Sequence, residues 1–127
     1  MPRRPAKTLR LQLRLKRGRD VVLGPGRAEL LERVARTGSI SAAAREMKMS
    51  YRHAWLLLEY TREIFGERLV ETAQGGPRGG GAKLTPAGRR ILAVYRRMER
   101  RAEAAIRPDI EQLFGPAAAP RRSTADR

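Results

Sequence analysis

The segment 25–66 has the spacing of three consecutive helices, and this feature constrains the fold more than any other in the chain. The first apolar stripe repeats with a helical period and consists of Leu30, Leu31, Val34 and Ala35. Gly38 follows this stripe, where a left-handed helix end favours glycine. Ser39 can cap a short alanine-rich helix over residues 40–47. Its small side chains would let another helix pack closely against it.

A third and longer helix is predicted to begin at Ser50 and to end at Gly66. Its apolar positions repeat at helical spacing and are Ala54, Trp55, Leu57, Leu58, Thr61, Ile64 and Phe65. We expect Trp55 to lie in the core and to anchor this helix against the short one. Two helices joined by a turn of about three residues form a helix-turn-helix, which presents the N-terminal end of its second helix to the major groove of DNA.

The first turn of the third helix is polar or polar-tipped, which is typical of a helix end that contacts DNA bases; it consists of Ser50, Tyr51, Arg52 and His53. Arg52 is the best candidate for base recognition, because a guanidinium can bind O6 and N7 of guanine together. Tyr51 is expected to contact a phosphate or a thymine methyl group. Ser50 either caps the helix alone or also binds a phosphate, and both interpretations stay open.

A glycine-rich hairpin is predicted directly after the third helix. Residues 69–71 and 82–84 have the pattern of two short strands, and the loop 75–81 between them is rich in glycine. Such a hairpin is typical of the wing of a winged helix, because glycines let the backbone approach DNA closely. The loop does not match a nucleotide-binding P-loop, since Ala82 follows Gly81 where that pattern requires lysine. A flexible linker is the remaining alternative.

The composition indicates a polyanionic partner, because 28 Lys and Arg against 13 Asp and Glu give a formal charge of +15 on 127 residues. Candidate DNA contacts outside the third helix are Ser39, Ser41, Arg78, Lys83 and Arg89. The chain contains no cysteine, which suits a reducing cytoplasm. No apolar run approaches the roughly 18 residues that a membrane span needs.

No arrangement typical of a catalytic site is present, so we expect neither enzyme activity nor a cofactor. His53 is the one histidine and has no carboxylate or cysteine neighbour at ligand spacing, which favours a DNA contact over a metal site. Glu59, Glu63 and Glu67 recur every four residues. They are predicted to form a solvated face of the third helix or to pair with Arg62.

The two ends of the chain carry further patterns. Residues 8–17 alternate apolar and polar side chains, which predicts a strand, and residues 21–23 are expected to return as its hairpin partner. The alternative is an amphipathic segment that packs on the domain. Before it, residues 1–7 form a basic arm, and residues 114–127 are expected to be a disordered tail.

A last helix is predicted to begin at Thr85, with Pro86 as its first helical residue, and to extend to residue 113. Steps of four and three residues, the spacing of a seam between paired helices, connect Ile91, Tyr95, Met98, Ala102 and Ala105. A homodimer seam is the favoured interpretation. The alternative is packing within the chain, against the first helix and the N-terminal strand.

Three parts of the chain carry a family resemblance: Gly-Ser-Ile-Ser-Ala-Ala-Ala at 38–44, Ser-Tyr-Arg-His-Ala-Trp at 50–55, and the glycine cluster that leads to Leu84, Thr85 and Gly88. Over residues 8–107 they resemble the N-terminal domain of the molybdate-responsive regulator ModE. A looser likeness is to the winged helix of LysR-type regulators. The resemblance implies a dimeric transcription factor whose recognition helix enters the major groove while the wing touches the flanking backbone.

The chain departs from the ModE pattern in three places. His53 replaces a smaller residue, which changes the expected target sequence. Lys48 stands in the turn where the family tends to have glycine, and a positive φ there would cost about 1 kcal/mol. ModE proteins continue into molybdate-binding domains, whereas this chain stops at Arg127, so we expect no such domain. Three possibilities stay open: the chain acts constitutively, it senses a signal through a partner, or its target genes are connected with molybdenum.

The sequence therefore predicts a mainly α protein with a small β component. A winged helix-turn-helix domain would occupy residues 8–84 and a dimerisation helix residues 85–113. The expected function is sequence-specific regulation on double-stranded DNA. A non-specific nucleoid-type or RNA-binding structural protein is the alternative, and an adaptor would need a concave apolar site.

Overall fold

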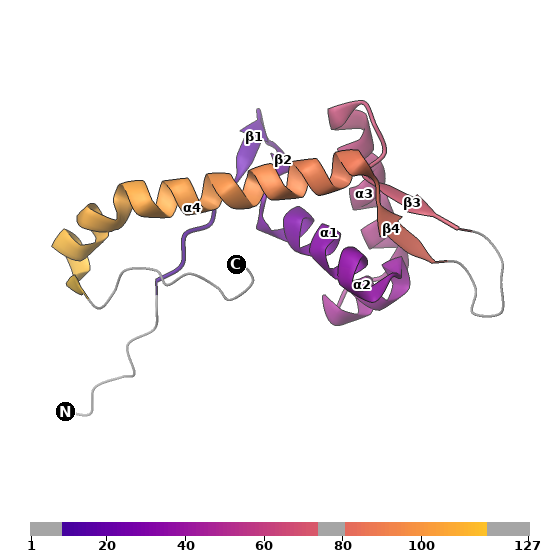
Figure 1. Cartoon of the computed structure of the whole chain (residues 1–127), viewed down its shortest axis with the longest axis horizontal. Coiled ribbons are helices and arrows are strands. Elements are labelled where there is room, and N and C mark those ends of the chain that lie inside the picture. Colours follow the sequence, from indigo (N-terminus) through magenta and orange to yellow (C-terminus); the bar gives the residue numbers. More distant parts are fainter. Residues whose placement is uncertain (1–8, 74–80, 117–127) are drawn as a thin grey trace. The chain divides into compact units, whose positions relative to one another are not determined.

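The computed structural model describes residues 9–73 and 81–116 (Figure 1). Its elements in chain order are β1 (Leu15–Arg17), β2 (Asp20–Leu23), α1 (Pro25–Thr37), α2 (Ile40–Glu46), α3 (Tyr51–Phe65), β3 (Val70–Thr72), β4 (Ala82–Leu84) and α4 (Pro86–Phe114). The chain divides into a compact unit of residues 14–94 and a second unit to which the described residues 9–13 and 95–116 belong. The expected winged helix-turn-helix, mainly α with a small β component, is confirmed.

The ends of the first three helices follow the predicted capping residues. Gly38 and Gly66 end α1 and α3 in the left-handed conformation, with φ of 72° and 73°. The Ser39 hydroxyl accepts a hydrogen bond from the Ala42 N–H at 3.0 Å, and the Ser50 hydroxyl accepts one from the His53 N–H at 3.0 Å. Each serine thereby satisfies a backbone donor that a helix start leaves without a partner.

The core of the 14–94 unit lies among α1, α2, α3, the wing strands and the start of α4. Ala43, Ala44 and Ala54 are almost fully buried, so small side chains let α2 and α3 approach closely. Trp55 does not belong to this core, and the expectation that it anchors α3 against α2 is wrong, since it is 45% exposed. The buried face of α3 carries Ala54, Leu58 and Thr61, and Trp55 is turned away from it by the helical twist.

The turn between α2 and α3 contains Lys48 in the left-handed region, with φ of 59°. The backbone N–H groups of Lys48 and Met49 donate to Arg45 and Ala44, at 3.1 and 3.0 Å. The turn therefore has the positive φ that the resemblance to ModE, with its glycine at this position, suggests. A β-carbon is strained in this conformation, whereas glycine adopts it freely.

Lys48→Gly is expected to raise the free energy of unfolding by up to about 1 kcal/mol, because it removes this strain. Chemical denaturation measures the change. Lys48→Ala is the matched control, since it removes the charge but keeps the β-carbon, and we expect it to stay within about 0.5 kcal/mol of the wild type. Equal stabilities of the glycine and alanine variants would contradict a strained turn.

The N-terminal hairpin is shorter than the alternation in the sequence predicts. β1 begins at Leu15, and residues 9–14 are not in a strand, so a strand over 8–17 is wrong except at its end. The reason is the length of the partner. β2 pairs antiparallel with β1, and Leu15 is already opposite Leu23, the last residue of β2. Residues before Leu15 therefore have no backbone partner in this sheet.

The start of α4 is bonded to the segment just before the wing. The Thr85 N–H donates to the Leu69 carbonyl at 2.9 Å, and its hydroxyl donates to the Arg68 carbonyl at 2.7 Å. The same hydroxyl accepts from the Gly88 N–H at 3.0 Å, which confirms Thr85 as the cap of α4. Gly88 lies so close to this segment that an added β-carbon would be 2.1 Å from the Leu69 oxygen.

Glu67 does not belong to a continuous acidic face of α3. The helix ends at Phe65, so Glu67 lies beyond it, and the predicted series is wrong at this position. Its carboxylate pairs instead with Arg90 in the first turns of α4, at 3.2 Å. This exposed pair adds to the link between the end of α3 and the start of α4.

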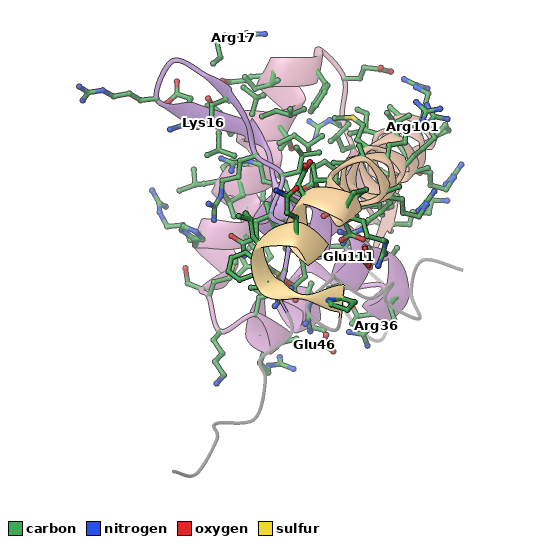
Figure 2. The ribbon with its side chains drawn as sticks, turned by 90° about the vertical axis from the view of Figure 1, so that its left-hand side faces the viewer. Lys16, Arg17, Arg36, Glu46, Arg101 and Glu111 are labelled. Carbon is green, nitrogen blue, oxygen red and sulfur yellow. The ribbon has the colours of Figure 1, made fainter. Side chains whose placement is uncertain are left out.

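An ion-pair cluster joins α1 to α2. The Glu46 carboxylate of α2 accepts hydrogen bonds from Arg36 and Arg33 of α1, and the labelled Arg36 and Glu46 side chains lie together in Figure 2. Arg33 also donates to Glu29 at 2.9 Å. Hydrogen bonds from two guanidinium groups hold the pKa of Glu46 below its ordinary value, and that of Arg36 has the larger effect, before that of Arg33. This link is therefore complete above the ordinary pKa of the carboxyl and is lost as the pH falls through the lowered value.

Candidate nucleic-acid interface

The exposed first turn of α3 brings together the four residues predicted for DNA contact. Ser50, Tyr51, Arg52 and His53 are all exposed. A helix turns by about 100° per residue, which places Arg52 nearly opposite the buried positions Ala54 and Thr61. Arg52 therefore lies near the middle of the outward face, while the back of the helix is fixed in the core. A rigid helix with a polar, cationic tip has the form needed for insertion into a groove.

The two serines at the start of α2 differ in their surroundings. Ser39 is half-buried, and its hydroxyl is already the acceptor that caps α2. Its carbonyl accepts a hydrogen bond from the Thr37 hydroxyl at 3.0 Å. Ser41 is exposed in the first turn of α2. Helix starts attract anions through their N–H groups, so both positions suit a phosphate contact, but Ser41 has the more accessible hydroxyl.

The wing is bonded to the turn between α1 and α2. The Ala82 N–H of β4 donates to the Gly38 carbonyl at 2.8 Å, which joins the hairpin to the helix-turn-helix. β3 and β4 pair antiparallel, with Val70 opposite Leu84 and Thr72 opposite Ala82. The wing strands thus belong to the same compact unit as α3.

The cations of the wing region have different local partners. The Lys83 side chain is 77% exposed and its Nζ lies 3.6 Å from a Glu71 oxygen. Exposed pairs of this kind contribute little, so the Lys83 ammonium can turn toward a phosphate at small cost. Arg89 is exposed and donates to the Leu84 carbonyl at 3.0 Å. Arg78 and most of the glycine loop lie outside the described residues.

The five residues of the predicted seam are in different environments along α4. Ile91 packs against the core of the 14–94 unit. Tyr95 is fully buried, and its hydroxyl donates to the Leu13 carbonyl at 2.6 Å. Met98 and Ala102 are partly exposed and Ala105 is exposed. Tyr95 therefore already packs within its own chain, as the alternative interpretation of the stripe expects at this position, whereas Met98, Ala102 and Ala105 retain accessible surface.

This geometry agrees with a known family. The family described as bacterial regulatory helix-turn-helix protein, lysR family, matches residues 26–89, from the first turn of α1 to the first turn of α4. The chain belongs to this family. The match includes the recognition helix and both strands of the wing, so the helix-turn-helix predicted from the sequence is confirmed.

Within the LysR-family helix-turn-helix, the chain is similar to ModE proteins. It is 47% identical over 72 residues to the molybdenum transport protein ModE of Herbaspirillum seropedicae, which covers 57% of this chain and 27% of that protein. It is 36% identical over 100 residues to the transcriptional regulator ModE of Haemophilus influenzae, which covers 79% of this chain and 39% of that protein. It is 39% identical over 83 residues to the DNA-binding transcriptional dual regulator ModE of Escherichia coli, which covers 65% of this chain and 32% of that protein.

The predicted resemblance to ModE is confirmed by these similarities. The matched segment of this LysR-family chain makes up between 27% and 39% of the length of these relatives. Of the helices that the structure describes, none is long and apolar enough to cross a membrane. Within residues 9–73 and 81–116, no group of three or more His, Cys, Asp or Glu could hold a metal ion.

Two exposed residues of the LysR-family recognition helix were missed as site candidates. Trp55 and Leu56 are 45% and 47% exposed, one turn after Tyr51 and Arg52. The helical period of the sequence could have identified them. Positions four residues apart lie on nearly the same side of a helix, so Trp55 shares a side with Tyr51 rather than with Ala54. The apolar positions of α3 at helical spacing are too widely spread around the helix to belong to a single buried face.

Proposed function

We propose that this chain binds double-stranded DNA at specific sequences through α3 and regulates transcription there, on chromosomal DNA in the cytoplasm. The observation that carries the proposal is the exposed first turn of α3, with Arg52 near the middle of its outward face, on a helix fixed in the core. The regulator names of the relatives from Haemophilus influenzae and Escherichia coli support it.

Each candidate residue has a role in this proposal. Arg52 binds guanine O6 and N7 in the major groove, and Tyr51 and His53 contact the adjacent bases or phosphates. Ser50 caps α3 and donates to a phosphate. Further phosphate contacts come from Ser39, Ser41, Arg78, Lys83 and Arg89. Phosphate contacts supply most of the affinity without sequence information, so specificity rests on the first turns of α3.

The proposed organisation assigns DNA binding to residues 8–84 and pairing of two copies to the helix of residues 85–113. A non-specific nucleoid-type or RNA-binding protein would share the high positive charge. It would have no need of a mixed set of hydrogen-bonding groups at the tip of one rigid helix, and this feature favours the sequence-specific function.

The proposal is tested by selecting bound fragments from a genomic library. We expect recovery of a small set of fragments that share one sequence, with two symmetric half-sites if the chain binds as a dimer. Recovery without a shared sequence would favour the non-specific alternative. The same selection with molybdate added tests the open question of sensing, since a changed set of fragments would show that the chain responds to the anion.

Met98→Glu is expected to raise the dissociation constant of the dimer at least about 30-fold, which corresponds to about 2 kcal/mol. The reason is that a carboxylate would replace an apolar side chain in the proposed seam. Analytical ultracentrifugation measures the change. Tyr95 is unsuitable for this test, because it is buried in its own chain and its substitution would disturb folding.

Ala104→Glu is the matched control for the seam, since Ala104 is exposed on α4 and lies outside the stripe. It adds the same charge to the same helix, and the dimer should persist. Circular dichroism verifies that both variants keep their helix content. A dimer of unchanged strength in the Met98→Glu variant would contradict the seam.

A further inference from the structure

The outward face of α3 changes from polar to apolar between its first and second turns. Tyr51, Trp55 and Leu56 are 52%, 45% and 47% exposed. They are three of the six large hydrophobic side chains that are exposed among the described residues, and all three belong to the first two turns of one helix. Large exposed apolar groups that gather in one place mark a binding surface.

The helical period arranges these side chains around Arg52. Residues four apart lie one above the other on a helix surface, so Trp55 follows Tyr51 and Leu56 follows Arg52. The opposite side of the same turns carries Ala54 and Leu58, which are buried. We call the four outward residues Tyr51, Arg52, Trp55 and Leu56 the α3 patch. Its polar half is the proposed base-reading tip, and its apolar half is continuous with that tip.

The continuity of the two halves of the α3 patch indicates what the apolar half binds. A helix that places Arg52 on a base edge also brings its next turn against the floor of the same groove. The major groove of duplex DNA displays one apolar group, the C5 methyl of thymine. The formal charge of +15 on the chain favours a nucleic acid over a protein as the partner of this surface.

We propose that Trp55 and Leu56 are specificity-determining residues that bind the C5 methyl groups of thymines close to the guanine contacted by Arg52. This inference rests on the proposed function, because it assumes that α3 enters the major groove. It adds a second base preference to that of Arg52 and makes the recognised half-site a guanine with neighbouring thymines.

Replacement of thymine by deoxyuridine, which lacks only the methyl group, tests the contact. The probe is the duplex recovered by the wild-type chain, with one thymine replaced at a time and affinity measured by fluorescence anisotropy at constant salt. We expect a weakening of about fourfold at one or two positions, the effect of losing one buried methyl group. In the Trp55→Ala or Leu56→Ala variant, the same replacement should no longer change the affinity.

Phe114→Ala is the matched control, because Phe114 is an exposed aromatic residue at the end of α4 and does not belong to the α3 patch. This variant should keep the full uracil penalty. Trp55→Phe should also keep most of it, since a phenyl ring preserves an apolar contact. Thermal unfolding verifies that each variant is folded.

The wild-type chain offers an independent readout, since Trp55 is its single tryptophan. Addition of the recovered duplex should shift Trp55 emission to the blue and lower its quenching by acrylamide at least twofold, whereas a duplex of scrambled sequence should do less.

Three results would overturn the inference while leaving the proposed function intact: tolerance of uracil at every position, a uracil penalty that persists in both alanine variants, or Trp55 emission and quenching unchanged by the recovered duplex. Failure to recover any preferred duplex would instead contradict the proposed function. Tighter binding of single-stranded than of duplex DNA would assign the aromatic face to base stacking and would also overturn the inference.

Discussion

Arg52→Ala is expected to weaken binding to the recovered duplex by about 1–3 kcal/mol and to remove the preference for one base pair. The guanidinium lies near the middle of the outward face of α3, where it can bind two acceptors of one guanine. Binding to duplex of random sequence should weaken much less. Titration of both duplexes at the same salt concentration measures the difference.

Arg62→Ala is the control for charge, because Arg62 is an exposed arginine in the last turn of the same helix. It removes the same charge from α3 and should change binding to the recovered and random duplexes by similar factors. Arg52→Lys should retain the charge but lose most of the base preference, since an ammonium cannot bind two acceptors in the same planar geometry. An equal loss on both duplexes for Arg52→Ala would show that Arg52 contacts only the backbone.

Gly88→Ala is expected to lower the free energy of unfolding by about 3 kcal/mol, at the upper end of the range for overpacking. The added β-carbon would be 2.1 Å from the Leu69 carbonyl oxygen and 3.0 Å from its carbon. These are backbone atoms, and the Leu69 oxygen also accepts the Thr85 N–H, so a movement of either side would disturb this hydrogen bond. Urea denaturation measures the loss.

Gly26→Ala is the matched control, because Gly26 occupies the first turn of α1 and an added β-carbon would meet nothing within 4 Å. At this position the change from glycine to alanine should be neutral or stabilise the protein by up to about 1 kcal/mol, because alanine has the higher helix propensity. A Gly88→Ala variant as stable as Gly26→Ala would mean that the start of α4 can move away from Leu69.

The fold could be predicted where the signal is local. Gly38, Gly66, Ser39, Ser50 and Thr85 act on backbone groups within four residues of themselves, so their positions alone define where helices begin and end. The positive φ at Lys48 was expected instead from the resemblance to ModE, in which the turn tends to have glycine. Because these signals fix four helices in order, the winged helix-turn-helix followed from the sequence.

Three differences from the sequence-based expectations concern contacts between separate segments of the chain. The length of β1 is limited by its partner β2, and alternation within one segment carries no information on that limit. Glu67 pairs with Arg90, 23 residues away, across a connection that sequence spacing does not reveal. Tyr95 donates to Leu13, 82 residues away, and so a residue with the spacing of an intermolecular seam is buried within its own chain.

The candidate site was predictable in its polar half and not in its apolar half. The exposure of Ser50 to His53 follows from their place at a helix start. The apolar positions at helical spacing include Trp55 and cover more than one side of α3. Helical phase separates Trp55 from Ala54, and the burial of Ala54 shows which of these two sides faces the core. Residue type and position conflict there, and such conflicts are expected at functional sites.

The central claim is that this chain recognises a particular duplex sequence through α3. The most direct measurement is the ratio of its affinities for the recovered duplex and for a scrambled duplex of equal length at about 150 mM salt, a concentration at which non-specific contacts are weak. The account predicts a ratio of about 1,000 or more. A ratio near one, or equal binding of a structured RNA, would contradict it.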